Sequence, residues 1–500
     1  MRRTALGRRL GLRGVRSSLN SPLFCSLPSP SRHDRAGRPP AVIDSFLTVK
    51  PANRVPANSN ATRSVDGAWG KRLERCRERT RALLEGVDER VLRRAAGPHL
   101  GPILWDLAHL AVYEDLWGVG AVLGNQARIT SNATAALYDA FEQPRHRRET
   151  LSMLELEQAF ELQDRVRART LEGLASASES TDPRLRIGGF VWHLLEQHEL
   201  QHAETMLQSL ARAGVRPGGD WPGGDWPGGD WASGDRDLER RPSVDGGPGP
   251  ISDKARIGFD TATVAIGRDV GGPFDNEFSA HAVQIPAFEL DRYPVTNRRY
   301  AEFVAEGGYD ARELWTAAGW EWRCRCDVQR PLDWVTDASG ALHVERFGTL
   351  QPLDAEEPVQ HVSAHEADAF ARYAGGRLPT EFEWERAAAT CRPPDPESHS
   401  LARPSLGPRR LPTETGSGPL AMFGHVYEWT ASEFTAYPGF IPYPYREYSS
   451  VFFDAGYRVL RGCSWAAWPG LARSTYRNWD RPDRRHLFAG LRLAWDVEGR

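Results

Sequence analysis

The chain has 500 residues, a length that excludes a single ordinary domain and predicts two or three. Its 63 Lys and Arg stand against 66 Asp and Glu, a formal net charge of −3, so the charge balance indicates neither a nucleic-acid partner nor a membrane-surface partner. An apolar fraction of 40% excludes wholesale disorder, and no stretch approaches the roughly 18–20 apolar residues of a membrane span. The 6 scattered cysteines favour a reducing compartment, so we expect a cytoplasmic protein.

Residues 1–65 are rich in Pro, Ser and Arg and have no sustained periodicity, so we predict a disordered N-terminal extension. The first residues have the composition of a transit peptide, with no acidic residue before Asp34. An upstream start codon in an Arg-biased genome would give the same composition, and we favour that simpler interpretation.

Apolar residues recur at helical spacing in four segments, which are residues 70–87, 102–123, 151–175 and 188–214. No strand pattern separates these segments. We therefore predict a four-helix bundle over residues 66–216.

A Gly- and Pro-rich region follows, in which the five-residue unit PGGDW is repeated. Such dense Gly and Pro exclude a helix or sheet interior, so residues 217–252 are predicted to be a flexible linker. We interpret the repeat as a short tandem expansion.

Residues 253–500 alternate short strand-like segments with loops rich in Gly, Pro and Trp. Two helices are predicted within them, and the second has Thr380 as its N-cap with Glu383 three residues on. The pattern favours an α+β domain whose long loops carry function. The whole chain is therefore predicted to be multidomain, with an α half and an α+β half.

The pentad from His198 to His202 is the most informative short motif. Residues four apart share a helix face, so both imidazoles can reach one metal ion. The letters match the H-E-x-x-H pattern of zinc metalloproteases, in which Glu199 would be the general base. His109, on the apolar stripe of an earlier predicted helix, supplies a third imidazole, whereas His193 projects in another direction. Imidazole suits zinc and iron alike, so hydrolysis and oxygen chemistry both stay open.

Longer strings make a family resemblance specific. The first half resembles a DinB-type metal-binding bundle, and the second half resembles the C-type-lectin-like domain of formylglycine-generating enzymes. Their fusion is similar to the ergothioneine-pathway sulfoxide synthase, or hercynine oxygenase, family. The strings that carry the resemblance are LWDLAH (104–109), LYDAFEQPR (137–145), QHELQHAETML (197–207), YREYSSVFF (445–453) and RNWDRPDRRHLFAGLRLAWD (477–496).

The resemblance implies a mononuclear non-haem Fe(II) held by His109, His198 and His202, with O2 as co-substrate. It implies that the sulfur of γ-glutamylcysteine is joined to the imidazole carbon of hercynine, the Nα-trimethyl betaine of histidine, to give a sulfoxide. An all-imidazole site is less anionic than one with a carboxylate ligand, which suits a thiolate at the metal.

The resemblance also implies roles for residues that bind the sulfur donor. Arg145 and Arg148 match substrate-binding arginines, and guanidinium groups can form paired hydrogen bonds with the two carboxylates of γ-glutamylcysteine. Asp480 is expected to pair with the ammonium group or to orient these arginines.

The resemblance further implies residues that bind hercynine and a residue that takes part in the reaction. Trp479, flanked by Asn478, matches the pocket for the trimethylammonium group, which favours an aromatic face. Gln201 matches a residue that contacts the hercynine imidazole. Tyr445 matches the catalytic tyrosine, and a phenol near bound oxygen can donate a proton or a hydrogen atom and so favour sulfur transfer over thiol dioxygenation.

Departures from the motifs of the related families reduce the number of activities that we expect. A formylglycine-generating enzyme needs a cysteine pair, and the matching positions are near Ala467 and Ala472, so that activity is not expected. Cys463 replaces the usual second Gly of the RGGSW motif and is interpreted as a tolerated small residue. Three alternatives remain. They are the same chemistry with cysteine or a selenium donor, a zinc hydrolase that uses the pentad, and a non-catalytic binding protein.

Overall fold

The computed structural model describes residues 59–174, 189–218, 251–252, 254–269, 274–391, 406–412, 418–443, 445–467 and 471–497. Most of the predicted N-terminal extension and of the predicted linker lies outside these residues, and the domain boundaries stay predictions. Among the described residues, no helix combines the length and the apolar character needed to cross a membrane.

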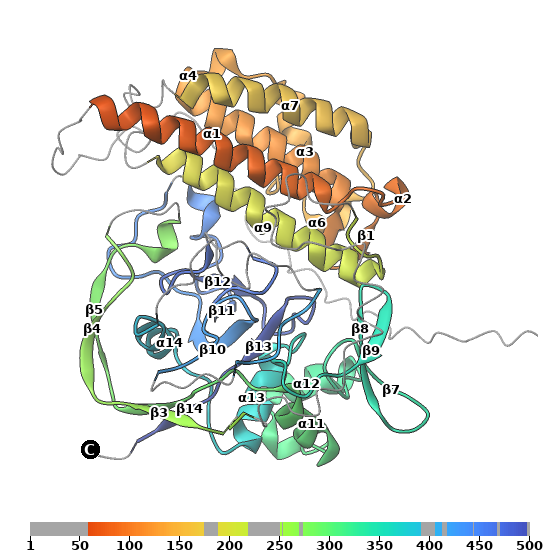
Figure 1. Cartoon of the computed structure of the whole chain (residues 1–500), viewed down its shortest axis with the longest axis vertical. Helices are drawn as coiled ribbons and strands as arrows, with labels where there is room; N and C mark the ends of the chain where they lie inside the picture. Colours follow the sequence, from red (N-terminus) through yellow and green to blue (C-terminus); the bar gives the residue numbers. More distant parts are fainter. Residues whose placement is uncertain are drawn as a thin grey trace, which may run out of the picture.

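Four long helices form the bundle at the top of Figure 1, as predicted: α1 (Ser59–Ala82), α3 (Ile103–Glu114), α7 (Leu156–Gly173) and α9 (Phe190–Ala213). Helix α1 begins before the boundary predicted at residue 66. Helix α3 packs against α7 and α9 and is buried along its whole length, which explains its apolar sequence. Helix α7 begins later than predicted, because Glu155 caps it through a reciprocal pair of bonds with Gln158.

The segment predicted as one helix over residues 102–123 is divided into three parts. After α3 the backbone widens into a π-helix, η1 (Asp115–Gly120), before a last turn, α4 (Ala121–Leu123). A Cβ on Gly118 would come within 2.9 Å of Leu195, so glycine allows the widened turn to pack closely against α9. Helical periodicity alone does not reveal such an insertion, which is frequent at functional sites.

Short elements complete this half of the chain. They are α2 (Glu89–Leu92), the paired strands β1 (Ala95–Gly97) and β2 (Leu100–Pro102), η2 (Asn125–Ala127), α5 (Asn132–Leu137) and α6 (Arg145–Arg148).

The second half is built on a four-stranded sheet of order β12-β11-β10-β13, and it confirms the predicted α+β class. Strand β10 pairs antiparallel with β11 and parallel with β13. Trp384 and Trp429 are fully buried in its core. The strands of this sheet are β10 (Tyr427–Glu433), β11 (Arg458–Arg461), β12 (Asn478–Asp480) and β13 (Ala489–Leu491).

In the described part of this half, three smaller sheets and four helices surround that sheet. The sheets are β14 (Ala494–Asp496) with β6 (Phe288–Asp291) and β3 (Arg256–Phe259), β4 (Ala262–Ile266) with β5 (His281–Ile285), and β7 (Trp334–Thr336) with β8 (Leu342–Arg346) and β9 (Thr349–Pro352). The helices are α11 (Asn297–Ala305), α12 (Ala317–Arg325), α13 (Ala364–Tyr373) and α14 (Glu381–Ala388), and α14 starts at the predicted cap, Thr380. Single 3-10 turns are η4 (Asp275–Glu277), η5 (Arg312–Leu314) and η7 (Arg446–Tyr448).

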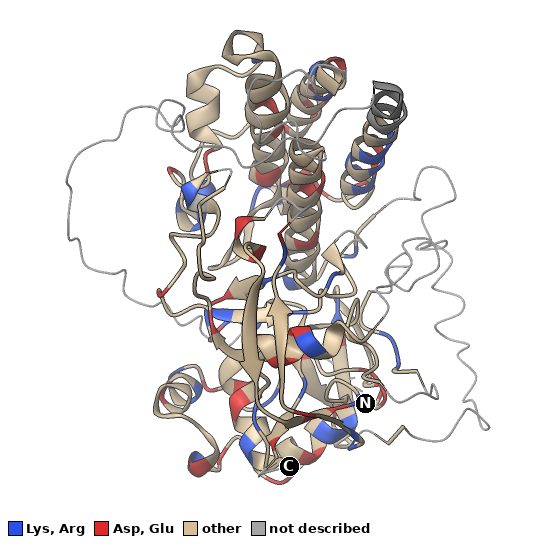
Figure 2. Cartoon of the chain, turned by 90° about the vertical axis from the view of Figure 1, so that its left-hand side faces the viewer, with Lys and Arg blue, Asp and Glu red and all other residues tan. Residues whose placement is uncertain are grey.

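The two halves share a buried boundary, with α9 the bundle helix that lies nearest the sheets (Figure 1). Tyr427 and Ser464 both donate hydrogen bonds to the buried carboxylate of Glu204 on α9. Arg212, near the end of α9, forms an ion pair with Asp333 at 2.6 Å. Figure 2 shows basic and acidic residues interspersed over both halves, consistent with the near-neutral net charge.

Cys463 lies in the second half at a turn that ordinarily favours glycine. Its φ is +77° and its side chain is fully buried. A left-handed conformation costs a residue with a Cβ roughly 1–2 kcal/mol, which explains why this position usually holds glycine. The small thiol fits this buried turn.

Candidate metal centre

Three histidines from two helices of the bundle lie together, as predicted. His109 comes from α3, and His198 and His202 lie one turn apart on α9. One nitrogen of each ring lies within 4.8 Å of the others, a spacing that a single metal ion can bridge. His109 and His198 are buried and His202 is partly exposed, so the cluster faces away from bulk solvent on most sides.

Neighbouring groups orient the imidazole of His109. His109 Nδ1 lies 2.7 Å from the carbonyl oxygen of Tyr138, which can only accept, so Nδ1 carries the proton and Nε2 is left for a metal. Trp105 stacks on the same ring, with centroids 5.0 Å apart. Among the described residues, His202 Nδ1 has no hydrogen-bond partner, and Asp106 Oδ1 lies 3.6 Å away.

Burial keeps the three rings neutral. It lowers the pKa of His109 from 6.5 to about 4, and it lowers the pKa values of His198 and His202 well below that of an ordinary histidine. Neutral imidazole is the form that binds metal ions. Three neutral imidazoles, each with one nitrogen converging on the others, therefore fit a divalent transition-metal ion.

Glu199, between the two pentad histidines, is held on the other side of α9. Its carboxylate pairs with Arg77 at 2.6 Å and with Arg167 at 3.2 Å. The same two arginines also bind Glu114, at 2.9 Å and 2.6 Å. All four side chains are less than 10% exposed. Glu199 therefore closes a buried ring of ion pairs and is not available to activate a water molecule at the histidines.

Tyr445 reaches the histidine cluster from the other half of the chain. It directly precedes η7, and its hydroxyl oxygen lies 3.3 Å from that of Tyr113. Tyr113 stacks on His198 with ring centroids 3.7 Å apart, so one ring separates Tyr445 from a predicted ligand. Trp117, in the π-helix, stacks on Tyr445 at 5.7 Å. Tyr113 and Trp117 were not singled out in the sequence, although they follow His109 at intervals of four residues.

Gln201 connects the pentad to a group of aromatic residues in the second half. Its side-chain amide donates to the hydroxyl of Tyr476 at 3.0 Å and lies 3.4 Å from that of Tyr448. Tyr448 meets Trp479 edge-on, with centroids 5.9 Å apart. Asn478 precedes Trp479 on β12, and its side-chain oxygen accepts the backbone N–H of Trp479. The predicted hercynine residues are thus linked, and Tyr448 and Tyr476 join them without having been predicted.

The Trp479 ring already has aromatic neighbours in the structure. Phe434 stacks on it at 4.2 Å, and Phe452 lies at 5.6 Å. Together with Tyr448 these rings form an apolar wall beside Gln201, of the kind that attracts a quaternary ammonium group.

Arg145 and Asp480 belong to one charged group together with Arg484, and their substrate-binding roles stay predictions. Arg145 donates to the backbone carbonyl of His99, and Arg484 lies 2.8 Å from His99 Nε2 and 3.6 Å from Asp480. Burial raises the pKa of Asp480, and the charges of Arg484 and Arg145 partly oppose that rise. A mixed group of this kind offers cationic and anionic contacts to a zwitterion.

Arg148 has a different environment from Arg145. It is buried, with its guanidinium 3.6 Å from the centroid of Trp105 and 3.6 Å from the carboxylate of Asp106. Trp105 in turn stacks on His109, so Arg148 lies one ring behind the histidine cluster. The two predicted arginines therefore differ in exposure, although they lie three residues apart on α6.

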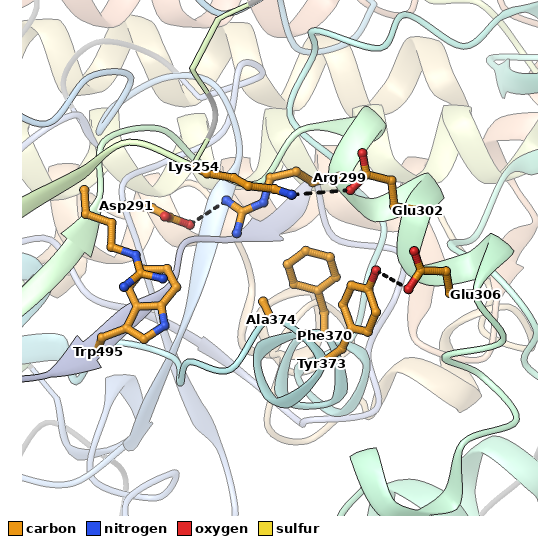
Figure 3. Close-up of a pocket in the computed structure, with 10 residues that line it drawn as sticks. Lys254, Asp291, Arg299, Glu302, Glu306, Phe370, Tyr373, Ala374 and Trp495 are labelled. Carbon is orange, nitrogen blue, oxygen red and sulfur yellow. Dashed lines mark hydrogen bonds and ion pairs between the residues drawn. The ribbon is translucent and has the colours of Figure 1, made fainter.

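A hollow of about 370 Å³ lies elsewhere in the second half, between α11, α13 and β14 (Figure 3). Two pairs of oppositely charged side chains meet within it: Lys254 faces Glu302 at 3.8 Å, and Arg299 binds Asp291 at 2.8 Å. It contains none of the clustered histidines. Because its charges neutralise one another, this hollow is a weaker candidate for catalysis than the histidine cluster.

Comparisons with known proteins agree with both halves. Residues 72–206 match the DinB superfamily, and residues 251–400 and 407–497 match the Sulfatase-modifying factor enzyme 1-like domain. The chain thus joins a DinB-type bundle, with a three-histidine cluster, to a domain of the formylglycine-generating-enzyme type.

Relatives that contain both halves are more specific. The chain is 38% identical over 446 residues to the hercynine oxygenase of Mycobacterium tuberculosis, which covers 85% of this chain and 98% of that protein. It is 38% identical over 464 residues to the hercynine oxygenase of Mycolicibacterium smegmatis, with the same coverage. The formylglycine-generating enzyme of Mycobacterium tuberculosis is 32% identical but covers 32% of this chain. The chain belongs to the hercynine oxygenase family.

Proposed function

We propose that this chain catalyses the O2-dependent joining of the γ-glutamylcysteine sulfur to the imidazole carbon of hercynine, with formation of a sulfoxide. The thiol and the imidazole carbon each lose one hydrogen, one atom of O2 becomes the sulfoxide oxygen, and the other leaves as water. The observation that carries the proposal is the cluster of three neutral imidazoles with a tyrosine from the second half one ring away, in a chain of this family.

His109, His198 and His202 would hold Fe(II). When bound, the iron would supply the binding and activation of O2 and a positive charge that attracts the substrate thiolate. None of the three ligands is anionic, which favours a thiolate beside them. The buried walls formed by Trp105 and Tyr113 exclude water from two of the rings.

Arg145 and Asp480 suit the glutamyl end of the sulfur donor. Arg145 is exposed and can bind a carboxylate, while Asp480 can accept the ammonium group. Arg148, whose guanidinium lies 3.6 Å from the carboxylate of Asp106 and over Trp105, would attract the second carboxylate by its positive charge. Two carboxylates on the donor match two arginines, which favours the dipeptide over free cysteine.

Trp479 and its aromatic neighbours suit the trimethylammonium group of hercynine, and Gln201 suits its imidazole. The hydroxyls of Tyr448 and Tyr476 fix the Gln201 amide, and this leaves its carbonyl oxygen to accept an imidazole N–H. Asn478 lies beside Trp479 on β12 and would contact the same substrate. These contacts would present the imidazole carbon toward the histidine cluster.

Tyr445 would donate a proton to the reactants during sulfur transfer. Replacing it with phenylalanine keeps the ring and removes the proton, so thiol oxidation to a sulfinate should become the main reaction. We expect the sulfoxide-to-sulfinate ratio in Tyr445→Phe to fall roughly 100-fold, the scale of a general acid. Mass spectrometry of the products measures this ratio, and an unchanged ratio would show that Tyr445 does not donate this proton.

The hydrolase alternative is weakened because Glu199 is enclosed by Arg77 and Arg167. The sulfur donor can be tested directly by competition between γ-glutamylcysteine, cysteine and a selenium analogue in one mixture. The proposal expects the dipeptide adduct to dominate. The 6 scattered cysteines of the chain suit a reducing compartment, and we propose that the enzyme acts in the cytoplasm.

A further inference from the structure

Tyr113 connects a predicted metal ligand with the tyrosine of the other half. It lies one turn after His109 on α3, and 8% of its surface is exposed. Its ring is nearly parallel to that of His198, at 15° with centroids 3.7 Å apart. Its hydroxyl oxygen lies 3.3 Å from the hydroxyl oxygen of Tyr445. One buried side chain therefore touches both groups on which the proposed chemistry depends.

We propose that Tyr113 is a positioning residue that acts through Tyr445, holding its hydroxyl in one orientation so that its proton can be given to the reactants. This inference rests on the proposed function above. It adds Tyr113, a residue of the bundle, to the proton donation that the proposed function assigns to Tyr445 in the second half.

The surroundings of Tyr445 support this assignment. Tyr445 lies in the extended segment just before η7, and not within a helix or strand that would fix its side chain. The bundle contributes two aromatic neighbours to it: Tyr113, whose ring is edge-on at 6.3 Å, and Trp117, which stacks at 5.7 Å. Trp117 owes its position to the widened turn of η1. Tyr448 also meets the Tyr445 ring edge-on at 6.1 Å, so the ring has one local aromatic neighbour and two that lie more than 300 positions away in the sequence.

The hydrogen bond between the two phenols has a direction that matters for chemistry. A phenol carries one proton and also accepts through its oxygen, and either tyrosine can be the donor here. When Tyr113 donates, its bond does not engage the proton of Tyr445, which can be transferred to a reactant. When Tyr445 donates, its proton is directed toward Tyr113 and away from the reactants. The proposed role requires Tyr113 to be the donor during the reaction.

Tyr113→Phe separates this role from simple packing, because phenylalanine keeps the stack on His198 and loses the hydroxyl. We expect iron content to be unchanged and the sulfoxide-to-sulfinate ratio to fall roughly 3- to 10-fold, the scale of one neutral hydrogen bond. The double variant Tyr113→Phe/Tyr445→Phe should match Tyr445→Phe alone, since Tyr113 acts through Tyr445. Tyr373→Phe is the matched control, because it removes a hydroxyl bonded to Glu306 in the other hollow.

Crystals of the metal-free protein give a readout that does not depend on activity. The Tyr445 hydroxyl should occupy one position in the natural chain and several positions, or a shifted one, in Tyr113→Phe. An unmoved Tyr445 hydroxyl, an unchanged product ratio, or an additive double variant would each overturn the proposal. If the natural chain forms no sulfoxide at all, the proposed function fails, whereas the crystallographic comparison still decides whether Tyr113 positions Tyr445.

Discussion

The two sides of helix α9 differ in whether their polar groups are satisfied within the fold. On one side, Glu199 joins Arg77, Arg167 and Glu114 in a closed set of buried ion pairs. On the other side, His198 and His202 converge with His109 and carry no charge. Buried charges that pair with one another make the fold sensitive to the loss of any one partner, whereas converging neutral imidazoles are able to bind a metal cation. The pentad therefore combines a structural residue with two candidate ligands.

The largest expected effect comes from the histidine side. His198→Ala should lower the affinity for Fe(II) more than roughly 100-fold. Removing only a group that hydrogen-bonds a metal ligand already lowers metal affinity roughly 10- to 100-fold, and this variant removes the ligand itself. Metal analysis after reconstitution measures this loss. His193→Ala is the control on the same helix, because His193 packs on Trp69 and not in the cluster. Normal iron content in His198→Ala would show that His198 is not a metal ligand.

The second-largest effect is expected on the side of α9 where Glu199 forms ion pairs. Glu199→Gln should lower the free energy of unfolding by about 3–5 kcal/mol, because it leaves buried guanidinium groups without their partner. Urea denaturation measures the change. Glu196→Gln, which loses a pair with the partly exposed Arg72, should cost less. A stable Glu199→Gln variant with full iron content but no sulfoxide product would show that Glu199 serves chemistry and not structure.

Recognition of the sulfur donor should show an intermediate effect. Arg145→Ala should raise the KM for γ-glutamylcysteine roughly 10- to 100-fold, the scale of a charged hydrogen bond, with little change in the KM for hercynine. Steady-state kinetics with each substrate varied gives this comparison. Arg147→Ala, an exposed neighbour on α6, is the control. Equal changes in the two KM values would contradict the assignment.

The smallest effect concerns pH. The pKa of His109 is about 4 in the folded protein and about 6.5 when unfolded, so the unfolded chain binds more protons between these values. Stability of the metal-free protein should therefore fall on acidification through this window, by less than about 1 kcal/mol per imidazole between pH 7 and pH 6. Denaturation at several pH values tests this sign. Stability that rises on acidification would contradict the burial of neutral rings.

Local periodicity predicted the helices and the shared face of the histidines, because both depend on neighbours a few residues apart. It could not predict which partner faces Glu199, since Arg77 and Arg167 lie on other helices. It also did not predict the π-helix, which lies within an apolar segment that has helical spacing. Spacing could not bring Tyr445 to Tyr113, 332 residues away, so Tyr445 was found through family resemblance and Tyr113 only in the folded chain.

The central claim is that the histidine cluster and Tyr445 together form a carbon–sulfur bond. The most direct measurement is anaerobic reconstitution with Fe(II), followed by isotopically labelled O2 with hercynine and γ-glutamylcysteine, and mass spectrometry of the products. The account predicts an adduct of the two substrates with a single labelled oxygen atom on sulfur. An iron-loaded protein that forms no such adduct, or that yields only the sulfinate of the thiol, would contradict it.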